Sequence, residues 1–138
     1  MITAVDSSVL IDIFGADAKF GVPSANLMRR CLSQGALIAC EVVWTETAVV
    51  FHRHEEFIEA MARLGVEFSP IEQKTTLTSA RAWRRYLDGG GQRHRVVADF
   101  LVGAHALEQA DRLMTRDRGF YRDYFAHLKV IDPAANTR

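Results

Sequence analysis

Short apolar runs rich in β-branched residues alternate along the chain with longer segments whose apolar residues recur at helical spacing. The short runs predict strands, and each is bounded by polar or glycine residues. The expected strands are residues 2–5, 36–39, 66–68, 112–115 and 128–131. Strands that alternate with helices are typical of a parallel sheet covered on both faces. We therefore expect an α/β fold of three α/β/α layers around a parallel sheet of roughly five strands.

Helix starts and stops follow from capping residues and glycines. The expected helices are 9–14, with Ser7 and Ser8 as N-caps; one from Ser24 that stops before Gly35; one from about Val42 to Val50; 54–64; 77–87, capped by Thr75 or Thr76; and about 96–110. An aromatic segment, residues 120–125, precedes the last strand.

The length of 138 residues predicts a single domain, residues 1–138. The apolar fraction of 49% and the charged fraction of 25% are ordinary for a soluble protein, and neither a signal peptide nor a membrane span is indicated. We expect a cytoplasmic protein without a membrane partner. Cys31 and Cys40 are too far apart for a CxxC pair, and we interpret them as reduced core residues.

Four acids stand at places where a charge needs a reason. Asp6 and Asp117 come at or just past the ends of two expected strands, and Asp99 begins an apolar helix. Glu46 falls in the first turns of its helix and, on the expected spacing, shares a face with Val42 and its other valines. Because the carboxyl ends of parallel strands lie along one rim, we expect all four carboxylates near that rim.

Four carboxylates without an associated His or Cys make an all-oxygen ligand set. Such a set selects Mg²⁺ or Mn²⁺ over zinc. One or two ions held there would lower the pKa of a bound water and stabilise charge on a phosphodiester under attack. The sequence therefore indicates a metal-dependent hydrolytic site, with catalytic and metal-binding roles for the same four acids.

Charge is uneven although the net charge is zero. Residues 1–74 carry ten acids against six Lys or Arg, whereas residues 81–122 carry nine Arg against five acids. The planar guanidinium matches phosphate well. We expect phosphate contacts from the arginines nearest Asp99 and Asp117, which are Arg93, Arg95, Arg116 and Arg118.

Other residues have simpler interpretations. His105 lies in an Ala-rich helix and is interpreted as a packed histidine, and Trp44 and Trp83 as packing or interface residues. The aromatic residues of 120–125 are expected to serve core and dimer packing, with base stacking as the alternative.

At its acids the chain resembles a known family. Ile2-Thr3-Ala4-Val5-Asp6-Ser7-Ser8, Val42-Val43-Trp44-Thr45-Glu46, Ala98-Asp99-Phe100-Leu101-Val102-Gly103-Ala104-His105-Ala106 and Leu113-Met114-Thr115-Arg116-Asp117-Arg118-Gly119-Phe120 resemble the motifs of PIN-domain proteins. Within that family the likeness is to VapC-type toxins of bacterial type II toxin–antitoxin pairs. The resemblance covers essentially the whole chain in order.

The resemblance implies a PIN-like fold and a metal-dependent endoribonuclease that leaves a 3′-hydroxyl and a 5′-phosphate. It implies that Asp6, Glu46, Asp99 and Asp117 bind Mg²⁺ or Mn²⁺, supported by Ser8 and Thr115. It also implies a homodimer and an antitoxin protein that blocks the active site. Gly119 stands where many relatives carry a further acid, so the number of metal ions stays open.

Two other functions remain as alternatives. One alternative is a phosphohydrolase that acts on another substrate class. Such an enzyme needs a nucleophilic Asp with a second acid two residues later, and Asp6-Ser7-Ser8 lacks that second acid. The other alternative is an interaction module without catalytic activity that keeps the fold and the dimer. Neither the RNA target nor the identity of the antitoxin can be deduced from one sequence.

Overall fold

The computed structural model describes residues 1–91 and 97–136. Five parallel strands form one sheet in the order β3-β2-β1-β4-β5. Their bounds are β1 Ile2–Val5, β2 Ala36–Ala39, β3 Val66–Phe68, β4 Arg112–Met114 and β5 Val130–Ile131. The expected parallel, five-stranded sheet is confirmed.

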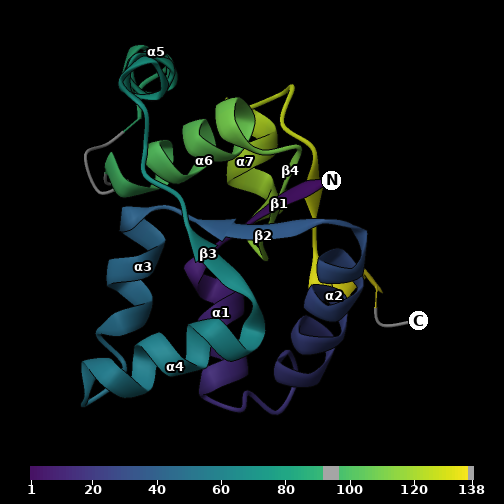
Figure 1. The fold of residues 1–138 in the computed structure, drawn as a ribbon. Helices are drawn as coiled ribbons and strands as arrows, with labels where there is room; N and C mark the ends of the chain where they lie inside the picture. The colour runs from purple at the N-terminus through teal and green to yellow at the C-terminus, as the bar shows by residue number, and fades with distance from the viewer. Residues whose placement is uncertain (92–96, 137–138) are drawn as a thin grey trace.

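Helices cover both faces of the sheet (Figure 1). One layer holds α1 Ser7–Phe14, α2 Gly21–Gln34, α3 Glu41–Ala48 and α4 His54–Leu64. The other holds α5 Gln73–Asp88, α6 Val97–Gln109 and α7 Arg118–Tyr124, and a short 3₁₀ turn, Pro133–Asn136, follows β5. The three-layer α/β/α architecture is therefore confirmed.

Several element boundaries differ from the sequence expectation. Asp6, and not Ser7 or Ser8, caps α1, because its carboxylate accepts a hydrogen bond from the Ser7 N–H. Both α2 and α5 begin earlier than expected, at Gly21 and Gln73. The two last strands are shorter than expected, and the aromatic segment forms most of α7. Neither α2 nor α5 begins at a side-chain cap, so a search for capping residues does not find where these two helices start.

The helix α3 corrects the expectation for Glu46. The helix ends at Ala48, so Val49 and Val50 lie beyond it and are exposed. Val43 and Thr47 form its buried side, whereas Glu46 is exposed in its second turn. Glu46 therefore does not share the buried stripe of the helix, and its carboxylate is accessible.

The core lies between the sheet and the two helix layers. Phe100 of α6 is fully buried and contacts the rings of Trp83, Tyr86 and Phe120. The buried rings of Phe120 and Tyr121 in α7 and of Phe125, which follows the helix, pack against one another, and this confirms the expected core packing of the segment. Trp44 packs against Phe57 and Phe68, and Trp83 stacks on Phe100, as expected of packing residues.

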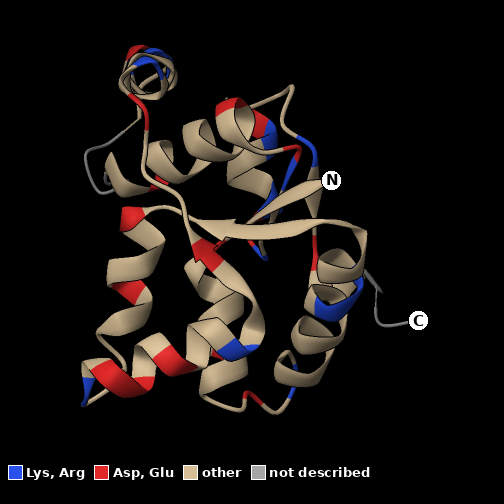
Figure 2. Ribbon diagram, in the orientation of Figure 1, with Lys and Arg blue, Asp and Glu red and all other residues tan. Residues whose placement is uncertain are grey.

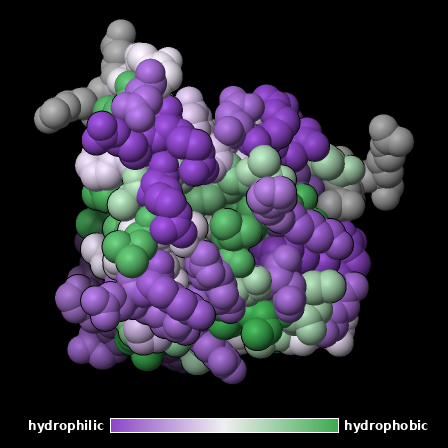
Figure 3. Space-filling view, turned by 90° about the horizontal axis from the view of Figure 1, so that it is seen from above, coloured by the Kyte–Doolittle hydropathy of each residue, from purple (hydrophilic) through white to green (hydrophobic). Residues whose placement is uncertain are grey.

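Charged residues follow the layers. Acids gather on α3 and α4, whereas α5 carries Arg81, Arg84 and Arg85 on its exposed side (Figure 2). Seen from the side of α5 and α6, hydrophilic side chains dominate and hydrophobic ones form smaller patches between them (Figure 3). No helix within the described ranges is both long and apolar enough to span a bilayer.

Candidate functional site

The sheet reverses its strand order between β1 and β4. From β1 the chain moves outward to β2 and β3, then returns to place β4 and β5 on the other side of β1. Val5 pairs with Met114, and the Asp6 N–H donates to the Met114 carbonyl at 2.9 Å. Open parallel sheets bind ligands at the carboxyl ends of the strands where the order reverses. Asp6 lies at that position.

The Asp6 carboxylate is fixed by two donors. Its Oδ1 accepts from the Ser7 N–H at 2.8 Å, and its Oδ2 accepts from the Thr115 hydroxyl at 2.7 Å. The same hydroxyl accepts from the Asp117 N–H at 3.0 Å. Thr115 is fully buried, and its two hydrogen bonds link Asp6 with Asp117.

A cavity of about 400 Å³ opens above these groups, and all four predicted acids line it. Its lining residues are Asp6, Ser7, Ser8, Ile11, Glu46, Asp99, Arg116 and Asp117; we call it the acid cavity. Glu46 enters from α3, and its Oε1 accepts from the Ser7 hydroxyl at 3.0 Å. Asp99 lies in the first turn of α6. The fold thus gathers carboxylates from four separate segments around one opening.

Asp6 is a destabilised anion in this setting. Burial is the largest effect, and it raises the pKa of Asp6 from 3.8 to about 6. Hydrogen bonds from Thr115 and the Ser7 N–H act in the opposite direction, while the charges of Glu46 and Asp99 raise the pKa of Asp6 further. A buried carboxylate among other carboxylates is relieved by protonation or by a cation.

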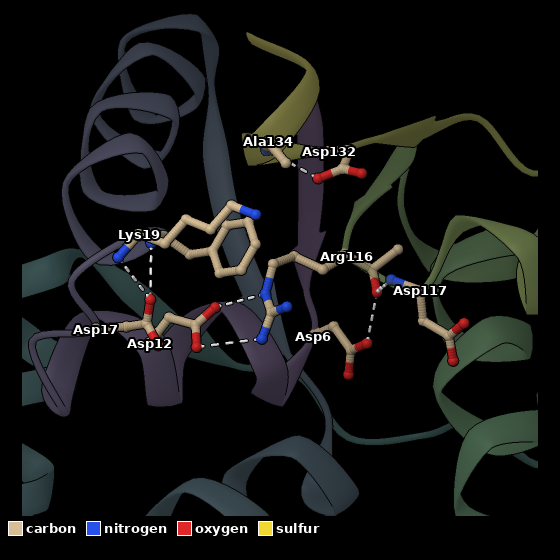
Figure 4. A network of polar contacts seen from close by, with 10 residues as sticks. Asp6, Asp12, Asp17, Lys19, Arg116, Asp117, Asp132 and Ala134 are labelled. Carbon is tan, nitrogen blue, oxygen red and sulfur yellow. Dashed lines mark hydrogen bonds and ion pairs between the residues drawn. The ribbon is translucent and has the colours of Figure 1, made fainter. Parts of the chain in front are cut away.

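The donor set fits a hard metal ion in its chemistry. All the acids and hydroxyls of the acid cavity offer oxygen, and the Ser8 hydroxyl beside them is buried without a hydrogen-bond partner in the described residues. Within residues 1–91 and 97–136, however, no three acids, histidines or cysteines stand close enough together to hold an ion as they are oriented. Figure 4 shows the Asp117 carboxylate directed away from Asp6.

Arg116 also lines the acid cavity, but its guanidinium is held by another acid. Its Nε and Nη2 donate to the two oxygens of Asp12 at 2.5 and 3.2 Å, and the Asp12 side chain is buried. The guanidinium lies 4.2 Å from the centre of the Phe20 ring, a favourable cation–π distance. In Figure 4 the side chain extends from beside Asp117 past Asp6 to Asp12.

Arg118, another predicted phosphate ligand, does not line the acid cavity. Arg118 is exposed, and its Nε is 3.0 Å from Oδ2 of the buried Asp132. Arg93 and Arg95 fall within 92–96, outside the residues that the structure describes. Of the four expected arginines, Arg116 alone lines the acid cavity among the described residues.

Two residues of this region have roles in the site that the sequence does not predict. Ser7 bridges Asp6 and Glu46, and Asp12 holds Arg116. The sequence does offer a sign that Asp12 is buried, since it is an acid inside the apolar run 9–14 and comes three residues after the buried Val9. Its partner is 104 residues away along the chain, and no local pattern gives that pairing.

The residues expected to be structural are indeed buried. His105 lies inside α6 with its Nε2 3.1 Å from the Ser69 hydroxyl, and burial lowers the pKa of this histidine. Cys31 and Cys40 are free and buried, as expected.

Known proteins share this fold. The solved structures that share it include VapBC2 from Rickettsia felis bound to a promoter DNA fragment, at 14% sequence identity and a TM-score of 0.73, with 96% of this chain and 98% of that chain covered. VapBC-1 from nontypeable Haemophilus influenzae shares it at 17% identity and a TM-score of 0.73, with 96% of this chain and 98% of that chain covered. A toxin-antitoxin complex from Klebsiella pneumoniae shares it at 18% identity and a TM-score of 0.65, with 95% of this chain and 97% of that chain covered. No curated protein matched the chain significantly. The family model described as PIN domain matches residues 3–125, so this chain belongs to the PIN domain family.

Proposed function

We propose that this protein is a Mg²⁺- or Mn²⁺-dependent endoribonuclease that acts as the toxin of a toxin–antitoxin pair. The observation that carries the proposal is the acid cavity, which four carboxylates from distant segments line at the point of strand-order reversal, with Asp6 among them. Membership of the PIN domain family supports a nuclease. The likeness of fold to VapBC and toxin-antitoxin complexes supports a toxin.

Asp6, Glu46, Asp99 and Asp117 would hold the metal ion, with Ser8 and Thr115 in support. Asp6 is the fixed member, since β1, the Ser7 N–H and the Thr115 hydroxyl set its position. Glu46 and Asp117 are exposed, so their side chains have room to turn toward Asp6 when a cation is present. Bound Mg²⁺ or Mn²⁺ would activate a water and stabilise charge on the scissile phosphate.

The remaining groups of the acid cavity would orient the reaction. Thr115 keeps one oxygen of Asp6 hydrogen-bonded, which leaves fewer directions in which that carboxylate can bind an ion. The Ser7 hydroxyl donates to the Glu46 carboxylate and would guide it at the cavity. Arg116, fixed by Asp12, would offer a cation to the RNA backbone at the edge of the cavity, and Arg93 and Arg95 are proposed as further phosphate contacts.

An antitoxin protein is the proposed partner, because several of the proteins that share this fold were solved as VapBC or toxin-antitoxin complexes. A homodimer and a cytoplasmic location are further parts of the proposal. Gel filtration with light scattering of the purified chain would measure the dimer directly.

The test is cleavage of labelled total cellular RNA by antitoxin-free protein in Mg²⁺, in Mn²⁺ and in EDTA. The proposal predicts discrete products with either metal and none in EDTA, and ligation-based end mapping would find a 5′-phosphate on the downstream fragment. Folded protein that binds metal but cleaves no RNA would contradict the nuclease and favour a silent interaction module. Release of phosphate from small phosphate esters without RNA cleavage would favour the phosphohydrolase.

A further inference from the structure

A second and larger cavity adjoins the acid cavity. It has a volume of about 590 Å³ and lies between the end of β4, the helix α7 and the strand β5. Arg116, Asp117, Arg118, Gly119, Arg122 and Asp132 are among its lining residues; we call it the arginine cavity. Arg116 and Asp117 line both cavities, so one wall separates them.

The arginines of this cavity are placed by buried acids. Asp132 is only 7% exposed, accepts from the Ala134 N–H at 2.9 Å and pairs with the Arg118 Nε at 3.0 Å. Asp12 holds Arg116 in the same manner from the other side. A guanidinium carries five N–H donors, and each of these pairs uses only part of them. The two arginines therefore present further donors in a fixed direction.

Arg122 completes the cavity and is the arginine that is least constrained. Its side chain is 76% exposed, and its partner Asp123 is an exposed neighbour with its Oδ1 at 3.3 Å. An exposed pair of this kind contributes little stability and is easily exchanged for a phosphate. Gly119 leaves the space beside this arginine open, because a Cβ built there would meet nothing closer than the Arg122 Nη2 at 3.8 Å.

We infer that the arginine cavity binds the phosphate of a nucleotide that flanks the cleaved bond in single-stranded RNA. The shared wall puts this subsite next to the carboxylates that would act on the scissile phosphate. Phosphate contacts fix the register of a strand without reading its sequence, and arginine is the side chain best matched to phosphate. Leu128 and Val130 supply an apolar part of the lining, against which a base can lie. The inference rests on RNA as the proposed substrate.

The test uses a charge placed in the cavity with a control matched in position. Gly119→Asp introduces a carboxylate beside Arg122, whereas Gly119→Ala introduces only a methyl group. Binding of a fluorescent 12-nucleotide RNA of mixed sequence is followed by anisotropy in EDTA, where metal-dependent cleavage does not interfere. We expect Gly119→Asp to bind roughly fivefold to tenfold more weakly than Gly119→Ala, with a salt dependence smaller by about 0.7 in logarithmic slope for each lost phosphate contact.

Arg122→Gln provides a second variant that does not depend on whether position 119 tolerates a side chain. It is expected to weaken RNA binding about as much as Gly119→Asp, while Arg84→Gln, which removes an exposed arginine of α5, leaves binding unchanged. Equal affinities for Gly119→Asp, Gly119→Ala, Arg122→Gln and the wild type would overturn the inference, as would a wild type that binds no RNA.

The outcome separates this inference from the nuclease proposal. If metal-dependent cleavage occurs but Gly119→Asp and Arg122→Gln bind like the wild type, the nuclease stands and the subsite is wrong. If these variants lose RNA binding and the wild type cleaves nothing with metal, the subsite stands and the nuclease proposal fails.

Discussion

The Thr115 hydroxyl lies 2.7 Å from Oδ2 of Asp6 and donates to it, although the two residues are 109 positions apart in the chain. The contact exists because β1 and β4 are neighbours whose carboxyl ends are in register. The hydroxyl also accepts from the Asp117 N–H, so one buried side chain holds two of the four acids.

Thr115→Val is predicted to destabilise the protein. The substitution keeps the volume but removes the donor to Asp6 and the acceptor for the Asp117 N–H, a loss of roughly 1–3 kcal/mol in the free energy of unfolding. Urea unfolding in EDTA measures it. Thr76→Val, at an exposed hydroxyl that donates to the Gln73 carbonyl, is the matched control and should stay within about 0.5 kcal/mol of the wild type.

The pH dependence of stability should report the strained Asp6 carboxyl. Its folded pKa of about 6 lies above the ordinary 3.8, so the folded state binds this proton more tightly than the unfolded state. The contribution of Asp6 is therefore most favourable below about pH 4 and is lost as the pH rises through about 6, by up to about 3 kcal/mol.

Urea unfolding of the wild type and of Asp6→Asn in EDTA, from pH 4 to pH 7, isolates this contribution as the difference between the two proteins. We expect the variant to gain stability relative to the wild type as the pH rises. A difference that stays constant over this range would show that the pKa of Asp6 is not raised.

Metal addition should stabilise the folded protein through the same carboxylates. A ligand at one hundred times its dissociation constant adds about 2.7 kcal/mol to the stability of the state that binds it. Mn²⁺ should raise the melting temperature of the wild type and have little effect on Asp6→Asn or Asp99→Asn. Asp88→Asn, which changes an exposed acid of α5, should respond like the wild type. An equal rise in all four proteins would argue against binding in the acid cavity.

Arg116→Gln should be costly because it leaves the Asp12 carboxylate buried without its partner. Breaking a buried ion pair from one side typically costs roughly 3 kcal/mol, whereas an exposed pair contributes at most about 1 kcal/mol. Arg84→Gln breaks the exposed pair with Asp88 and is the control. If the two substitutions destabilise the protein equally in urea unfolding, the Asp12 contact does not fix Arg116.

The sequence predicts the sheet and most of the acid cavity for a physical reason. Asp6 follows β1 directly and Asp117 comes three residues after the end of β4, so local pattern and the rule for parallel strand ends place them together. Asp99 likewise lies in the first turn of an apolar helix.

What the sequence does not reveal depends on contacts between distant segments. Glu46 lines the acid cavity, yet the reason deduced from its valines is wrong, because α3 stops before Val49. Arg116 pairs with Asp12, and Arg118 pairs with Asp132. Each pair forms only because the fold brings two segments together, and helical or strand periodicity does not predict such contacts. These pairs decide which arginine donors face each cavity.

The central claim is that Asp6 and the acids around it bind a metal ion that drives RNA cleavage. The most direct measurement is the initial rate of cleavage of one mapped RNA substrate as Mn²⁺ is titrated, for the wild type, Asp6→Asn and Asp88→Asn. If this claim holds, the rates saturate with Mn²⁺ for the wild type and Asp88→Asn, and the rate is lower by at least about a hundredfold for Asp6→Asn, which loses a carboxylate at the ion. A rate for Asp6→Asn equal to that of the wild type at every Mn²⁺ concentration would contradict it.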